Sequence, residues 1–234
     1  MSKHWLERLW EVWGDRPAPL SRTVEITRQI VATHNPFTPV FNAFRFYADG
    51  TESGSSPLAA QNTNITVDVS SGNQQVHLRV RIDETGGDSS GSGNDDWVLE
   101  SQKNGSGGFV SIDGSQAGLT MDTGSSLTNN GATTNRATNG ISDGPGSFVA
   151  GIQKEGDSGQ ILDYQLTAGN FTEHVFAMLL TAASLNNGDF FDFRVTLNGG
   201  TPGMTNNVTP RITIVKSAPS ASPKLEPSKI VRSW

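Results

Sequence analysis

Alternation of apolar and polar residues marks several segments of the chain as β-strands. The clearest spans residues 76–82, where Val, Leu, Val and Ile alternate with His77, Arg79 and Arg81. A period of two is typical of a strand that is buried on one face, so we expect the polar face of this strand to be toward solvent. Further strand-like segments are residues 44–46, 65–69, 95–100, 108–112, 147–150, 161–164, 173–181, 190–197 and 211–215.

The connections between these segments carry their own signals. Asn104 and Gly105 separate two strand-like runs, which is a strong indication of a β-hairpin. Residues 113–147 consist largely of Gly, Ser, Thr, Asn and Asp, with a few apolar anchors. We expect them to form either a functional surface loop or short irregular strands. The anchors are Leu119, Met121 and Leu127.

Near the start of the sequence, the apolar residues recur with the period of a helix and not with that of a strand. Residues 2–14 predict a short amphipathic helix, because its apolar residues recur at helical spacing before Gly14. A helix of this length is marginally stable in water. It must therefore pack against its own domain, a partner or a membrane surface. The membrane is disfavoured, because the polar face of this helix is not strongly basic. The apolar stripe contains Trp5, Leu6, Leu9, Trp10 and Trp13.

Both ends of the chain are predicted to be extended arms. In residues 21–33, Val24 and Ile26 alternate with Glu25 and Thr27, which favours a strand-like conformation. Residues 217–234 are rich in Pro, Ser and Ala and cannot bury enough surface to fold alone. We therefore expect a helix and docking arm over residues 1–42, a β-sandwich domain over 43–216 and an extended arm over 217–234.

Composition agrees with an all-β chain. The 234 residues include 26 Gly and no Cys, and only 17% are charged. Many turn formers and few charges are typical of short strands joined by loops, and disulfides are excluded. The sequence shows no signal peptide, and no apolar stretch long enough to span a bilayer.

Charge is distributed unevenly along the chain. Residues 31–215 carry a net charge of −10, residues 1–30 of +1 and residues 216–234 of +3. An acidic body with basic ends is unlike a nucleic-acid-binding protein, whose basic charge gathers on a folded face. The distribution suits ends that contact an acidic neighbour, such as another copy of the body.

No motif in the sequence predicts catalysis, a metal site or a cofactor. There is no nucleophile elbow and no phosphate-binding loop, so we expect a protein that is not an enzyme. The histidines are scattered, although His77 and His174 lie in predicted strands and could meet across a sheet. A group of acidic residues beside a Gly/Ser-rich loop leaves calcium open as an alternative, without EF-hand spacing. These residues are Asp83, Glu84, Asp88, Asp95 and Asp96.

Two further groups of residues have a structural and a binding interpretation. Aromatic residues at alternating strand positions are expected in the core, with a sugar-stacking platform as the alternative. They are Trp97, Phe109, Tyr164, Phe190, Phe191 and Phe193. Strand arginines are expected on a solvated face, with contacts between subunits as the alternative. They are Arg45, Arg79, Arg81 and Arg194.

Residues 44–215 resemble a β-domain found in structural proteins of tailed bacteriophages. The resemblance lies in strand and turn patterns: Phe44–Gly50, Leu58–Ile65, Val76–Ile82, Trp97–Val110, Thr172–His174, Gly188–Val195 and Thr209–Ile212. It implies a single Ig-like or related β-sandwich in a virus particle, and it supplies no catalytic residue.

These observations predict a virion structural protein, made in the host cytoplasm, that decorates the capsid or is a minor capsid protein. Its partners are expected to be capsid or tail subunits and further copies of itself, with no nucleic acid and no membrane. The alternatives are a glycan- or receptor-binding module of a tail fibre or tail tip, and a tail-tube or neck component. The expected partner-binding residues are Trp5, Leu9, Trp10, Trp13, Arg232 and Trp234.

Overall fold

The computed structural model describes residues 36–90, 95–114, 116–136, 138–156, 158–198 and 204–217. The chain divides into two units, Met1–Asn35 and Pro36–Trp234, and all described residues belong to the second. They form an all-β body that contains no α-helix. Its elements are β1 (Pro39–Ala48), β2 (Ile65–Asp68), β3 (Gln74–Glu84), β4 (Trp97–Lys103), β5 (Val110–Ser111), β6 (Leu119–Met121), β7 (Phe148–Lys154), β8 (Gln160–Ile161), β9 (Phe171–Leu180), the 3-10 turn η1 (Ala182–Ser184), β10 (Phe190–Leu197), β11 (Thr205–Asn206) and β12 (Arg211–Val215).

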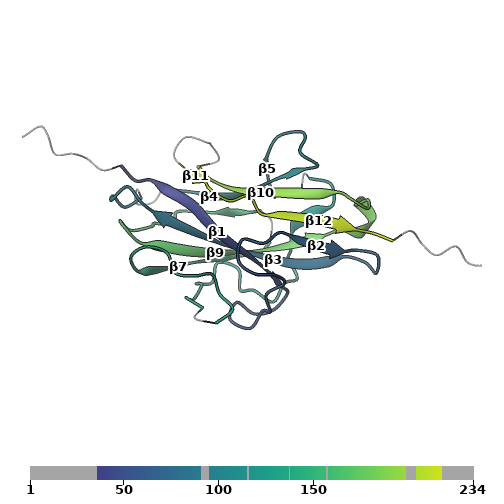
Figure 1. Cartoon of the computed structure of the whole chain (residues 1–234), viewed down its shortest axis with the longest axis horizontal. Coiled ribbons are helices and arrows are strands. Elements are labelled where there is room, and N and C mark those ends of the chain that lie inside the picture. Colours follow the sequence, from purple (N-terminus) through teal and green to yellow (C-terminus); the bar gives the residue numbers. More distant parts are fainter. Residues whose placement is uncertain are drawn as a thin grey trace, which may run out of the picture. The chain divides into compact units, whose positions relative to one another are not determined.

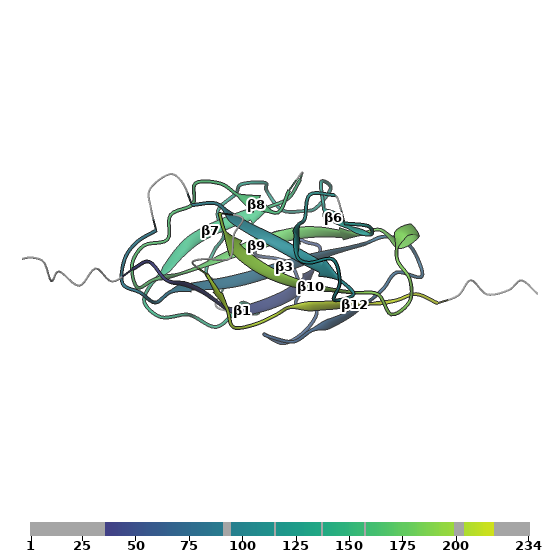
Figure 2. The same cartoon turned by 90° about the horizontal axis from the view of Figure 1, so that it is seen from above.

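The strands form two sheets that face each other, as in a β-sandwich (Figures 1 and 2). The first sheet has the order β11-β1-β3-β9-β6, with β7 also paired to β9. The second has the order β2-β12-β10-β4-β5, with β8 also paired to β4. Most pairs are antiparallel, whereas β1–β11, β2–β12 and β7–β9 are parallel.

The core lies between the two sheets and is built from the apolar faces that the sequence predicts. Phe191, Phe193 and Val195 of β10 are all fully buried, which confirms that they share an inward face. The rings of Phe46 in β1 and Phe193 lie 6.3 Å apart, edge to face, and so connect the first sheet to the second. Such pairs add to the free energy gained by burying the apolar surface alone.

The predicted hairpin is confirmed. Asn104 and Gly105 have φ angles of 53° and 65°, and strand β4 pairs antiparallel with β5 after this turn. Both positive angles are those that a tight hairpin turn requires. Residues 113–147, expected to form either a functional surface loop or short irregular strands, contain a short strand. β6 forms there, and Leu119, Met121 and Leu127 are buried.

The first strand begins earlier than the predicted domain boundary. β1 starts at Pro39, within the segment predicted as an arm. Proline is accepted at the first position of a strand, where its missing N–H costs little. Residues 36–38 have no regular structure, as the prolines around them indicated. The predicted helix over residues 2–14 and the tail beyond Ser217 lie outside the described residues.

The described body begins and ends at opposite ends. The start of β1 lies at one end and the end of β12 at the other in both perpendicular views (Figures 1 and 2). The chain therefore enters and leaves the body at two separate places. In the part of the chain that the structure describes, no helix has the length and apolar character that crossing a bilayer requires.

Candidate functional site

The polar face of β3 is buried, and the predicted solvent-facing position is wrong. Arg79 and His77 are each only 1% exposed, because loops cover the side of the first sheet that faces away from the second. The guanidinium of Arg79 donates to Glu173 of the neighbouring β9, to Glu52 at 2.6 Å and to the carbonyl oxygen of Thr134. Arg79 therefore binds the sheet to two separate loops.

The neighbouring polar side chains of this face hold the same loops. Arg45 donates to the carbonyl of Gly140 at 2.8 Å, and the Tyr47 hydroxyl to that of Asn139 at 2.7 Å. Arg81 donates to the carbonyl of Ser142 at 2.6 Å. We call residues 49–55 and the described part of 126–143 the covering loops. Three of the four strand arginines predicted on a solvated face, Arg45, Arg79 and Arg81, instead donate to backbone carbonyls within the chain. Arg194 pairs with Glu100 and is 30% exposed.

The two carboxylates around Arg79 have opposite pKa shifts. Burial raises the pKa of Glu173 above its usual range, although the guanidinium of Arg79 opposes this effect. Burial also acts to raise the pKa of Glu52, but the hydrogen bonds from Thr134 and Arg79 outweigh it and lower that pKa. Such a buried arrangement is costly to break, because any remaining charge stays desolvated. The cluster acts as a structural connection between sheet and loops.

His174 lies on the other face of the same sheet, so the two histidines that could have met across it do not. In the β3–β9 register His174 is opposite Val80 on the core side, whereas His77 is opposite Ala177. The imidazole packs against Tyr164 at 4.7 Å and Trp97 at 6.0 Å, and its Nδ1 accepts the N–H of Ile152. Burial lowers the pKa of His174 to about 3, so this side chain is a neutral part of the core.

The depressed pKa predicts acid-dependent stability. Between pH 6.5 and pH 3 the unfolded chain protonates His174 and the folded chain does not, so the free energy of unfolding falls as the pH falls. The loss from this one group is about 2 kcal/mol between pH 7 and pH 5. Urea titrations at both pH values should show a smaller loss in His174→Asn, whose amide oxygen can still accept the Ile152 N–H. Equal pH dependence in the two proteins would show that His174 titrates normally.

The acidic residues considered for calcium are engaged by protein donors. Glu84 accepts the backbone N–H groups of Thr38, Gly86 and Gly169. Burial acts to raise the pKa of Glu84, but these hydrogen bonds outweigh it and lower that pKa. Asp83 pairs with Arg81. Among the described residues, no three His, Cys, Asp or Glu side chains converge as metal ligands would.

The expected location of the strand aromatics in the core is confirmed for three of the six. Trp97, Phe191 and Phe193 are fully buried. Two others are partly exposed on the second sheet, and each is stacked with an arginine. Arg194 lies 4.5 Å from the ring centre of Phe109, and Arg211 lies 4.1 Å from that of Phe190. One face of each ring is thus already occupied.

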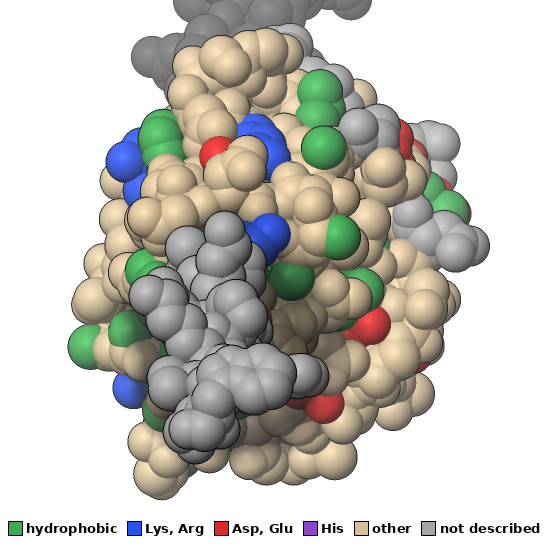
Figure 3. Space-filling model, turned by 90° about the vertical axis from the view of Figure 1, so that its right-hand side faces the viewer, with side chains coloured by type: hydrophobic (Ala, Val, Ile, Leu, Met, Phe, Trp, Pro, Cys, Tyr) green, Lys and Arg blue, Asp and Glu red, His purple; other side chains and the backbone are tan. Residues whose placement is uncertain are grey.

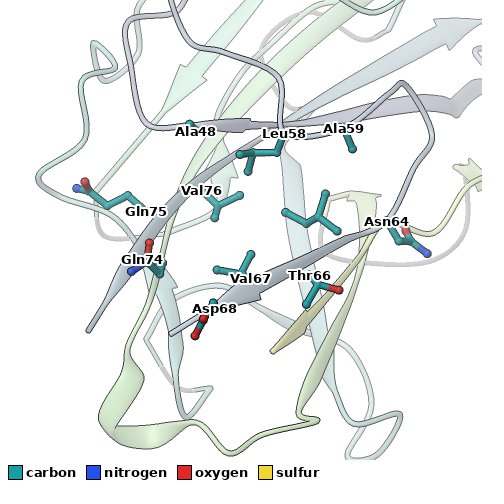
Figure 4. Close-up of a pocket in the computed structure, with 11 residues that line it drawn as sticks. Ala48, Leu58, Ala59, Asn64, Thr66, Val67, Asp68, Gln74, Gln75 and Val76 are labelled. Carbon is teal, nitrogen blue, oxygen red and sulfur yellow. The ribbon is translucent and has the colours of Figure 1, made fainter. Parts of the chain in front are cut away.

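A groove beside β2 is an open feature of the described body. It has a volume of about 540 Å³ and lies between β2 and the adjoining ends of β1 and β3. Leu58, Val67 and Val76 point into it, whereas Thr66 and Asp68 point away (Figure 4). Leu58 is 47% exposed, which is unusual for a large apolar side chain in this body. The end of the body at which β12 terminates is mostly uncharged (Figure 3).

The groove borders a sheet edge with free backbone groups. β2 is the last strand of the second sheet and pairs only with β12 among the described strands. The N–H of Val69 donates to the carbonyl of Val215 at 2.9 Å. Because these groups alternate along a strand, the N–H and C=O of Thr66 and Asp68 point to the opposite, unpaired edge. An apolar groove beside unpaired backbone groups is the arrangement that an added peptide strand requires.

No family model, curated protein or solved structure matches the chain.

The predicted partner-binding residues all lie outside the described residues, so their role stays a prediction. They are Trp5, Leu9, Trp10, Trp13, Arg232 and Trp234. Sequence reasoning missed Glu52 and Glu173 as partners of Arg79, and it missed the groove beside β2. The signal for the groove was available in part, since Leu58 is an apolar residue in a polar segment between two strands.

Proposed function

We propose that the chain is a structural protein of a virus particle of the tailed-bacteriophage type, either a capsid decoration protein or a minor capsid protein. An Ig-like sandwich forms its body, and its terminal arms attach that body to capsid or tail subunits. It is made in the host cytoplasm and acts in the virion.

One observation carries this proposal: the described body begins and ends at opposite ends, with sequence remaining beyond both (Figures 1 and 2). The N-terminal 35 residues include the apolar stripe of Trp5, Leu9 and Trp13. The last 19 residues carry a net charge of +3, against −10 for residues 31–215. Two attachment segments at two places allow one body to connect different neighbours. The opposite charges favour contact between the terminal segments of one copy and the acidic body of another.

The interior supports a mechanical role. The ionisable side chains on the outer face of the first sheet bind the covering loops, through Arg79 to Glu52 and through Arg45 to Gly140. These contacts stabilise a rigid body. A glycan-binding module is less well supported, because the aromatic residues considered for sugar stacking are buried, stacked with arginine or, for Tyr164, packed against His174.

Removal of residues 1–16 tests the proposal. Loss of the apolar stripe should lower incorporation of the protein into virus particles by about tenfold or more, because buried anchors dominate such interfaces. Quantitative mass spectrometry of purified particles measures this occupancy. Thermal unfolding of the described body should be unchanged by the deletion.

Leu162→Ala is a suitable control, since Leu162 is an exposed apolar residue of the body. It should enter particles at the normal occupancy. Full occupancy of the deletion variant would refute an anchoring role for residues 1–16.

A further inference from the structure

We propose that the free edge of β2 and the groove beside it bind residues 22–28 from a neighbouring copy of the chain, as an added β-strand. This inference rests on the proposed assembly role of the arms and names the site at which one arm binds.

The hydrogen-bonding groups for such a strand are present on β2. Thr66 and Asp68 direct four backbone groups away from β12, and no other described strand pairs with them. The corresponding side of β1 is different, because the segment after it covers it. Leu58 and Asn62 donate their N–H groups to the carbonyls of Phe46 and Phe44, at 2.9 and 2.8 Å. The edge of β1 is thus protected against pairing with another chain, and that of β2 is left open.

The groove selects an extended segment with small apolar residues at alternate positions. In a strand added beside β2, every second side chain would face Leu58, Val67 and Val76 (Figure 4). The groove is short, because β2 has only four residues. Two aliphatic side chains at positions i and i+2 would therefore fill it.

Residues 22–28 of this chain meet that requirement. Val24 and Ile26 occupy alternate positions, and Arg22 and Arg28 follow at the same spacing on either side. No Lys or Arg lines the groove, and the one charged residue in its lining, Asp68, directs its carboxylate to the other face of β2. The segment has a net charge of +1 and the body is acidic. Charge complementarity therefore favours this occupant over the more acidic segments of the body.

The length of the chain favours the arm of a neighbour over the chain's own arm. The groove is lined by Ala48, at the far end of β1 from the point where the chain enters the body. β1 spans about 30 Å, and the ten residues from Ile26 to Pro36 can reach at most about 35 Å. The chain's own arm would have to run back along the body almost fully extended. An arm from a neighbour placed end to end needs no such strain.

Such contacts join unlike surfaces, the arm of one copy and the edge of the next. Repetition of a contact of this kind produces a ring or a filament. It follows that the interface can be interrupted from either side, by changing the arm or the edge.

Thr66→Pro tests the edge. It removes the outward N–H of Thr66, and proline is tolerated on an edge strand when its N–H faces solvent. Sedimentation velocity of the full chain should show self-association in the wild type. We expect this variant to weaken it by about tenfold or more, the effect of losing a backbone hydrogen bond and adding a ring at the contact.

Thr66→Val is the matched control, because it changes the same side chain and keeps the N–H. It should associate like the wild type. Leu58→Lys provides a second test inside the groove if the proline variant unfolds, since Leu58 is exposed and its replacement leaves the core intact. It too should associate about tenfold more weakly.

A mixing experiment identifies the occupant. Val24→Asp with Ile26→Asp removes the arm, and Thr66→Pro removes the edge. At a protein concentration at which the wild type assembles but a tenfold weaker contact does not form, each variant should be monomeric alone. An equimolar mixture should then form a dimer, because the intact arm of the edge variant can enter the intact edge of the arm variant. If the mixture stays monomeric, or if the arm variant still assembles, the proposal is wrong.

Monomeric wild type at all concentrations would also overturn this inference. In that case, protection of the backbone N–H groups of the groove from hydrogen exchange in the monomeric wild type, but not in the variant with Val24→Asp and Ile26→Asp, would show that the chain's own arm occupies the groove. Neither result would affect the particle-incorporation test, so failure of the inference is distinguishable from failure of the proposed function.

Discussion

Replacement of Arg79 by methionine is expected to lower the free energy of unfolding by about 3–5 kcal/mol, because it leaves buried charge without a partner. Arg79 is 1% exposed and binds Glu173 and Glu52, whose side chains are 0% and 8% exposed. Both carboxylates would have to remain desolvated without the guanidinium or become protonated. The covering loops would also lose the bond to the Thr134 carbonyl. Urea unfolding followed by fluorescence measures the loss.

Arg194→Met is the matched control. Arg194 pairs with Glu100 on the second sheet, and its side chain is 30% exposed, so solvent screens the pair. The expected loss is about 1 kcal/mol or less. Combining Arg79→Met with Glu173→Gln should recover part of the stability, because one buried charge is removed. Similar losses for Arg79→Met and Arg194→Met would mean that the buried cluster does not hold the loops.

Replacement of Trp97 by alanine is expected to cost about 3–5 kcal/mol, the range for removing a large aromatic side chain from a packed core. The indole is fully buried, packs edge to face against Phe37 at 6.3 Å, and donates to the carbonyl of Tyr164 at 3.2 Å. Its loss would leave a cavity beside His174 and an unpaired carbonyl. Thermal and urea unfolding of the full chain measure this effect.

Phe109→Ala provides the comparison, since Phe109 is a partly exposed aromatic stacked with Arg194. Its removal should cost about 1 kcal/mol, the usual size of an exposed cation–π contact together with a small loss of burial. If Trp97→Ala is as mild as Phe109→Ala, the ring does not belong to the core, and a binding role for it would regain support.

The sequence predicts the strands well where one face is apolar. The alternation in residues 190–197 locates β10 and its inward face correctly, because period-two burial is a local property. The Asn104–Gly105 turn is equally local, since both residues must adopt positive φ. These elements need no information about distant parts of the chain.

The position of the polar face of β3 could not be predicted in the same way. Whether Arg79 faces water or a loop depends on residues 52 and 134, which are distant in sequence and carry no periodic pattern. A chain with few charges, in which several arginines occupy strands, offers a hint that these side chains bind carbonyls or carboxylates internally. The groove beside β2 depends in the same way on the path of the segment that contains Leu58.

Residue-resolved amide exchange of the full chain, dilute and assembled, tests the central claim that the covering loops are structural and that assembly uses the open edge. The N–H groups of Thr66 and Asp68 should exchange quickly in the dilute protein and slowly after assembly. The N–H groups of Thr133 and Thr134, which donate to Gly151 and Glu52, should be protected in both states. Unchanged exchange at Thr66 and Asp68, with new protection confined to residues 134–143, would contradict this account.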